Sequence, residues 1–152
     1  MQESTNHARE AGRYDPESDT VYINAALETD EAVEFVLKHE LTHAIEGSKE
    51  YAQLEGLVRR EMGDGMFRLA AKQQARERLA AGDMTGAQNA EKEVVADWIG
   101  RNLYQKGFAQ AVAGKSRPLA TELYRVARWW AACWAPGRRW PAKWHSRRTI
   151  SA

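Results

Sequence analysis

Cysteine is nearly absent from this sequence: Cys133 is the only one, so the chain cannot form an intrachain disulfide. Long apolar runs are also missing, and none reaches the length of about 18 residues that a membrane-spanning helix requires. Residues 1–10 are polar and contain no apolar stretch of the kind found in secretory signal peptides. These absences favour a reducing compartment, and we expect a cytoplasmic protein without a transmembrane segment.

Acidic side chains are absent after Glu122, whereas this end of the chain is rich in basic residues. The basic residues are Arg125, Arg128, Arg138, Arg139, Lys143, Arg147 and Arg148. Residues 133–152 also contain Trp134, Trp140, Trp144 and two prolines, and their apolar positions follow neither a helical nor a strand period. We expect residues 133–152 to form a basic, tryptophan-rich tail with little regular structure.

The remaining 1–132 segment has the composition of an ordinary globular domain, and we expect residues 1–12 to be a mobile arm. Residues 13–24 place two short β-prone segments around a Pro/Ser/Asp turn, which predicts a hairpin. Apolar periodicity and capping residues predict helices at about 30–46, 49–61, 66–81, 87–105 and 119–132, with a short apolar turn or helix at 108–113. The predicted fold class is α+β and mostly α, with four to five helices.

The first predicted helix contains the sequence His39-Glu40-Leu41-Thr42-His43, an H-E-x-x-H pattern. Residues four apart lie on one face of a helix, so the two imidazoles can point at a common position. Zinc accepts nitrogen ligands in a roughly tetrahedral arrangement, and Glu40 lies close enough to accept a proton from a water on the metal. The pattern therefore predicts a catalytic zinc site; a buried helix with two satisfied histidines is the alternative.

A catalytic zinc usually takes three protein ligands and a water, so one more ligand is needed. Glu93 and Asp97 lie one turn apart on a later predicted helix. We expect Glu93 to complete the metal site and Asp97 to accept a hydrogen bond from one zinc-binding histidine. Glu91 is a competing carboxylate without an acid four residues later. Weaker candidates for the ligand are Cys133, His7 and His145.

The combination of His39-Glu40-x-x-His43 and Glu93-x-x-Ala96-Asp97 resembles the gluzincin metallopeptidases. It is similar in particular to the minimal zincin domains of the ImmA/IrrE type and their relatives in phage and mobile-element proteins. The resemblance covers residues from about 12 to 123, and it implies a minimal zincin-like domain that hydrolyses a protein or peptide substrate. It also implies that His39, His43 and Glu93 bind zinc and that Glu40 is the general base.

Several functional details remain open at the level of sequence. Tyr51 and Tyr104 are candidate donors for an oxyanion, although either could serve only in packing. The strand edge at residues 21–24 could hold an extended substrate. One alternative function is a non-catalytic zinc-binding module. Another is binding of nucleic acid or an anionic surface through the basic tail, whose cations and aromatic rings suit that role.

Overall fold

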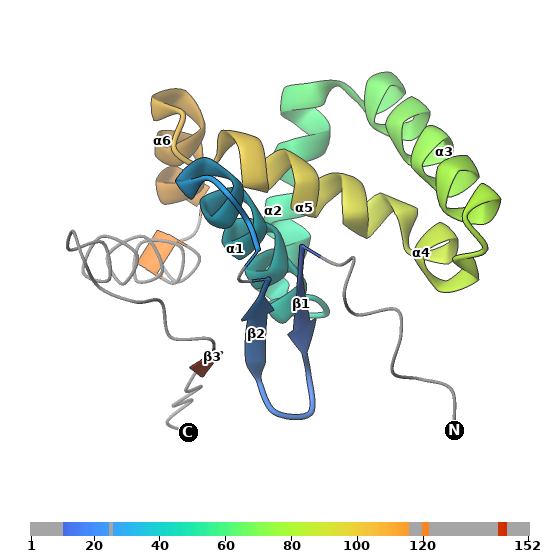
Figure 1. Ribbon diagram of the computed structural model, residues 1–152. Coiled ribbons are helices and arrows are strands. Elements are labelled where there is room, and N and C mark those ends of the chain that lie inside the picture. The colour runs from blue at the N-terminus through green and yellow to red at the C-terminus, as the bar shows by residue number, and fades with distance from the viewer. Residues whose placement is uncertain (1–10, 25, 116–119, 122–142, 146–152) are drawn as a thin grey trace, which may run out of the picture.

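The computed structural model describes residues 11–24, 26–115, 120–121 and 143–145. Within these ranges the elements are β1 (Gly12–Asp15), β2 (Thr20–Ile23), α1 (Asp30–Ala44), α2 (Lys49–Met62), α3 (Asp64–Ala80), α4 (Met84–Gln88), α5 (Ala90–Asn102), α6 (Lys106–Lys115) and β3 (Lys143–His145). Figure 1 shows the hairpin of β1 and β2 projecting below a body of helices, with α1 next to the hairpin and α5 running across the body above it. The predicted α+β, mostly helical class is confirmed.

The predicted hairpin forms as an antiparallel pair, in which Gly12 faces Ile23 and Asp15 faces Thr20. β3 pairs with the other edge of β2, so the sheet order is β1-β2-β3. Residues 133–152 were expected to hold little regular structure, and within the described residues they contribute this one short strand. The predicted substrate edge at residues 21–24 is also wrong, because β2 is the central strand and β1 lies at the edge.

Helix α1 is capped by Thr29, whose hydroxyl accepts a hydrogen bond from the Ala32 backbone N–H at 3.2 Å. The hairpin packs on one side of this helix through a small apolar cluster. The cluster consists of Val21, Leu37 and Leu41, with Tyr14 and Ile23 packed against it. This packing fixes β1 beside the face of α1 that carries the two histidines.

A larger core lies among α2, α3, α5 and α6. Its fully buried members include Leu54, Val58, Phe67, Val95 and Ile99. Burial of side chains of this size stabilises a fold by about 1.5–3 kcal/mol each. The core therefore holds α5 rigidly in the body, and α5 in turn packs along α1.

The described residues form six helices where four to five were predicted, and several helix boundaries differ from the prediction. Gly63 adopts a positive φ of 81° and separates α2 from α3, but Asp64 and Gly65 already belong to α3. The single helix predicted at 87–105 is divided at Asn89 into α4 and α5. Apart from residues 120–121, which are helical, the helix predicted at 119–132 lies outside the described residues.

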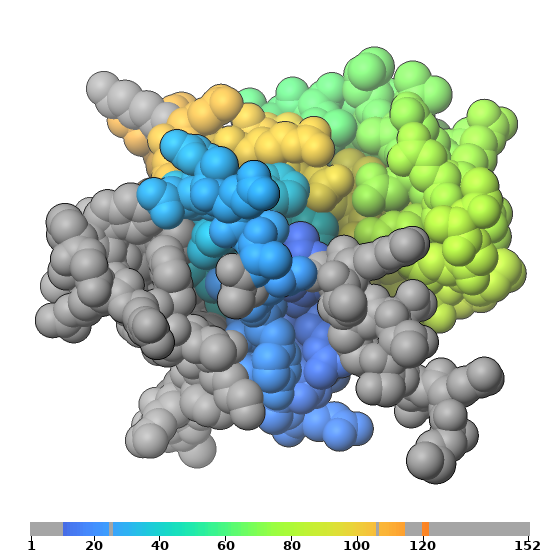
Figure 2. All heavy atoms as spheres, viewed as in Figure 1, coloured from blue at the N-terminus to red at the C-terminus, as the bar shows by residue number. Residues whose placement is uncertain are grey.

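The space-filling view shows the hairpin, in blue, below the helical body, with α3 and α4, in green, on one side (Figure 2). In the described part of the chain, no helix has both the length and the apolar character needed to cross a lipid bilayer.

Candidate metal centre

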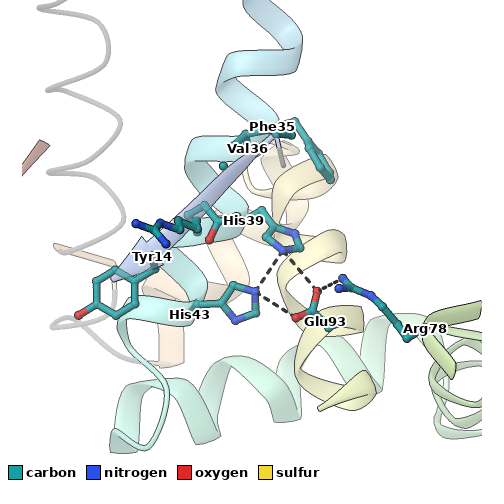
Figure 3. Close-up of a pocket in the computed structure, with 11 residues that line it drawn as sticks. Tyr14, Phe35, Val36, His39, His43, Arg78 and Glu93 are labelled. Atoms are coloured by element: carbon teal, nitrogen blue, oxygen red, sulfur yellow. Dashed lines mark hydrogen bonds and ion pairs between the residues drawn. The ribbon is translucent and has the colours of Figure 1, made fainter. Parts of the chain in front are cut away.

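Two histidines from α1 face a carboxylate from α5. The Nε2 atoms of His39 and His43 are 3.1 Å apart, as expected for imidazoles that are one helical turn apart and point to a common position. Glu93 places Oε2 3.6 Å from the His39 Nε2 and Oε1 3.6 Å from the His43 Nε2. Figure 3 shows the three side chains converging from the two helices.

This donor set fits a divalent transition-metal ion. Within the described ranges, His39, His43 and Glu93 form a group whose ligand atoms all lie within 4.8 Å of one another. Two imidazole nitrogens and one carboxylate match the protein ligands of catalytic zinc sites, which keep a further position open for water or substrate. The three side chains predicted as ligands are therefore brought together by the fold.

The far side of each imidazole faces a carboxylate. The Nδ1 atom of His39 lies 3.0 Å from Asp97 Oδ1, an ion-pair contact that lacks the alignment of a hydrogen bond. His43 has a closer partner, since its Nδ1 is 2.6 Å from Glu46 Oε1. Glu46 is fixed in turn by Lys92 of α5, whose Nζ is 2.8 Å from Oε2. Such carboxylates orient a histidine ring and raise its basicity as a metal ligand.

Asp97 was predicted for this role, whereas Glu46 was missed. The sequence feature that could have indicated Glu46 is its position three residues after His43. Glu46 lies just beyond the end of α1. In a regular helix, residues three apart are neighbours on the surface. The spacing of Glu46 from His43 can be read from the sequence, but its contact with Lys92 of α5 cannot.

The charges around His39 shift its pKa and those of its partners. Burial by itself lowers the pKa of His39, but the carboxylates of Asp97 and Glu93 outweigh burial and raise the pKa to about 9. Burial raises the pKa of both Glu93 and Asp97, yet the nearby His39 and arginine charges reverse this effect and hold both values below the ordinary range. In the metal-free protein, the centre therefore carries a protonated imidazole between two carboxylates.

Glu40 lies beside the histidines and is buried, with a residue exposure of 8%. Burial raises its pKa, and the charges of the two histidines oppose this effect. The backbone N–H of Tyr14, in β1, donates a hydrogen bond to the Glu40 carboxylate. The strand that leads into the hairpin thus positions the side chain predicted as general base.

These groups lie in a cleft of about 460 Å³. Its walls are Ala11, Gly12, Arg13 and Tyr14 from the region of β1, Phe35, Val36, His39, Glu40 and His43 from α1, Arg78 from α3 and Glu93 from α5. The cleft therefore runs between the edge strand and the histidines. Arg78 is a site residue that sequence reasoning missed, because only the turn between α3 and α5 brings its side chain to Glu93.

Other candidates lie elsewhere. Glu91 pairs with Arg59 at 2.7 Å on the far side of α5, so it does not compete with Glu93. Tyr51 is buried in the large core, and Tyr104 stacks against Lys38 at 4.6 Å from the ring centre. Neither tyrosine lines the cleft, so the structure does not support them as oxyanion donors.

Some predicted features fall outside the described residues. Cys133 and His7 do so, while His145 lies in β3. Most of the basic tail also lies outside the described residues, so its binding to nucleic acid or an anionic surface stays a prediction. The mobile arm predicted at residues 1–12 lies outside the described residues as far as Glu10, but its predicted end is wrong, because Gly12 belongs to β1 and the Ala11 carbonyl is paired with Asn24.

Comparison with protein-family models, curated protein sequences and solved structures gave no match for this chain. The resemblance to gluzincins therefore remains a prediction that rests on the motif residues.

Proposed function

We propose that this protein is a zinc-dependent endopeptidase of the gluzincin type. The observation that carries the proposal is the convergence of His39, His43 and Glu93 on one position, with Glu40 beside them in a cleft. Two helices far apart in the sequence supply these groups. A bound zinc would lower the pKa of a coordinated water to about 7 and polarise a substrate carbonyl.

Glu40 supplies the proton transfers in this proposal. Its carboxylate accepts a proton from the attacking water and returns it to the nitrogen that leaves when the peptide bond breaks. Burial raises its pKa, which makes the carboxylate a better proton acceptor near neutral pH. The hydrogen bond from the Tyr14 backbone keeps the carboxylate at the cleft wall before substrate binds.

The edge strand β1 suits an extended peptide. Asn24 donates its backbone N–H to the Ala11 carbonyl at 2.9 Å, and hydrogen-bonded pairs alternate along antiparallel strands. The backbone N–H and C=O of Gly12 therefore point away from β2 at the cleft wall. A substrate strand can pair there by β-augmentation, in which backbone hydrogen bonds give affinity without requiring a particular sequence.

The substitution Glu40→Gln tests the proposed function. It keeps the size of the side chain but removes proton transfer, so we expect peptide hydrolysis to fall by about 100-fold or more. Zinc content, measured by elemental analysis of the purified protein, should stay at the wild-type level. The assay is cleavage of a mixed peptide library followed by mass spectrometry.

A non-catalytic zinc-binding module gives a different result. Wild-type protein would then bind zinc but cleave no peptide in the library, and Glu40→Gln would have no activity to remove. Equal hydrolysis by wild type and variant would also contradict the role of Glu40.

A further inference from the structure

Arg78 extends from the last turn of α3 into the wall of the cleft, where it meets a proposed metal ligand. Its Nη2 lies 2.8 Å from Glu93 Oε2, and its Nη1 lies 2.9 Å from Asp83 Oδ2. Asp83 is held by the Gly86 backbone N–H at 2.8 Å, as the cap of α4. The guanidinium is therefore fixed between two carboxylates and points into the centre (Figure 3).

The two oxygens of Glu93 consequently differ. Oε2 accepts the charge-assisted hydrogen bond from Arg78, which is among the stronger kinds of hydrogen bond in proteins. Each oxygen also lies 3.6 Å from one histidine Nε2, Oε2 from that of His39 and Oε1 from that of His43, but only Oε2 carries the hydrogen bond from Arg78. A carboxylate that is engaged at one oxygen in this way presents the other oxygen to a metal ion.

We propose that Arg78 is a positioning residue that limits Glu93 to one oxygen in its contact with the metal. This inference rests on the proposed function and names a residue that controls that site. A carboxylate bound through both oxygens would fill a second coordination position, whereas a catalytic zinc needs a position for water and substrate. Arg78 keeps that position open by retaining Oε2 for itself.

This arrangement predicts whether removing Arg78 strengthens or weakens zinc binding. The guanidinium competes with the metal for Glu93 and adds a positive charge near it. Its loss frees Oε2 and removes that repulsion, so Arg78→Ala should bind zinc more tightly, by roughly tenfold for a unit charge and a divalent ion about 6 Å apart in water. A residue that served only to hold the fold together would give weaker zinc binding when removed.

The experiment compares wild type, Arg78→Ala and Arg78→Lys with Arg76→Ala as the matched control. Arg76 lies on the same helix with an exposed side chain and does not line the cleft. Zinc affinity is measured by competition with a chromophoric chelator, and coordination by the visible absorption of the cobalt(II) form. Four-coordinate cobalt(II) absorbs more strongly than five-coordinate cobalt(II), so this readout reports the number of ligands directly.

We expect Arg78→Ala to show tighter zinc binding, weaker cobalt absorption and lower peptide turnover, while Arg76→Ala matches wild type. Arg78→Lys keeps the charge and should return affinity toward the wild-type value. An Arg78→Ala protein with unchanged affinity and spectrum would overturn the inference, as would weaker zinc binding together with a lower melting temperature. If wild type binds zinc but cleaves no peptide, the proposed function fails while the cobalt spectra still decide the role of Arg78. Wild-type protein that binds no metal overturns both.

Discussion

At the scale of single residues, the centre depends on where protons reside. His39 lies between Glu93 and Asp97, with Nε2 toward the first and Nδ1 toward the second. Its pKa is raised from 6.5 to about 9 because the two carboxylates outweigh burial. A metal ion needs the neutral imidazole, so metal and proton compete for the same nitrogen.

This competition predicts that zinc binding at pH 7.5 releases a proton from His39. Calorimetric titrations in two buffers with different ionisation enthalpies would measure the release. The Asp97→Asn variant loses the main group that raises the pKa of His39, so it should release fewer protons. Identical binding enthalpies in the two buffers would contradict the prediction.

The same shift affects the stability of the metal-free protein. The unfolded pKa of His39 is 6.5 and the folded value is higher, so the stabilisation by protonated His39 is fully present below pH 6.5. It is lost as the pH rises through about 9. The free energy of unfolding without metal should therefore fall over this window, apart from contributions of other groups.

At the scale of elements, the site requires β1 to lie directly on α1. Gly12 makes this possible, since a Cβ atom there would be 2.4 Å from Val36 Cγ1 and 2.9 Å from the Tyr22 carbonyl oxygen. Both distances are shorter than a Cβ contact allows. The Tyr22 carbonyl belongs to the paired strand β2, so it cannot shift without disturbing the sheet. The strand therefore approaches the helix closely enough for Tyr14 to reach Glu40.

Replacing Gly12 with alanine should therefore destabilise the fold by about 1–3 kcal/mol, the usual cost of overpacking. Urea denaturation measures this change. Gly56→Ala is the control, because nothing lies within 4 Å of a Cβ atom at that position in α2. Alanine there should stabilise the helix by about 0.5–1 kcal/mol. A Gly12→Ala protein as stable as wild type would show that β1 does not need this close approach.

At the scale of the whole molecule, the proposed ligands connect parts of the chain that fold around different clusters. His39 and His43 belong to α1, which packs with the hairpin, and Glu93 belongs to α5, which is anchored in the larger core. Gly100 lets these helices approach, because a Cβ atom there would meet the Phe35 ring at 2.6 Å. A bound metal would therefore connect the two packing units.

Zinc should accordingly stabilise the folded protein. At free zinc about 100-fold above the dissociation constant, the stabilisation is about 2.7 kcal/mol, which raises the melting temperature by roughly 5–10 °C. Glu93→Gln should lose most of this rise, whereas Glu91→Gln should keep it because Glu91 pairs with Arg59 instead. Thermal melts with zinc and with a chelator measure the effect. Loss of the rise in Glu91→Gln but not in Glu93→Gln would overturn the ligand assignment.

The sequence by itself determined the local features. Helix spacing alone places His39 and His43 on one face. Thr29 and Ser48 are of residue types that favour helix starts, because their hydroxyls accept hydrogen bonds from backbone N–H groups there. The periodicity also gave the hairpin and most helix positions. These features depend on residues within a few positions of one another, which is why a sequence pattern can reveal them.

Only the tertiary structure decided which distant groups meet. It selected Glu93 over Glu91, added Glu46 and Arg78 to the centre, and removed Tyr51 and Tyr104 from it. It also made β1 the edge strand, by pairing β3 with β2. The orientation of α5 against α1 comes from the packing of side chains in two cores, and no local pattern in the sequence encodes that orientation.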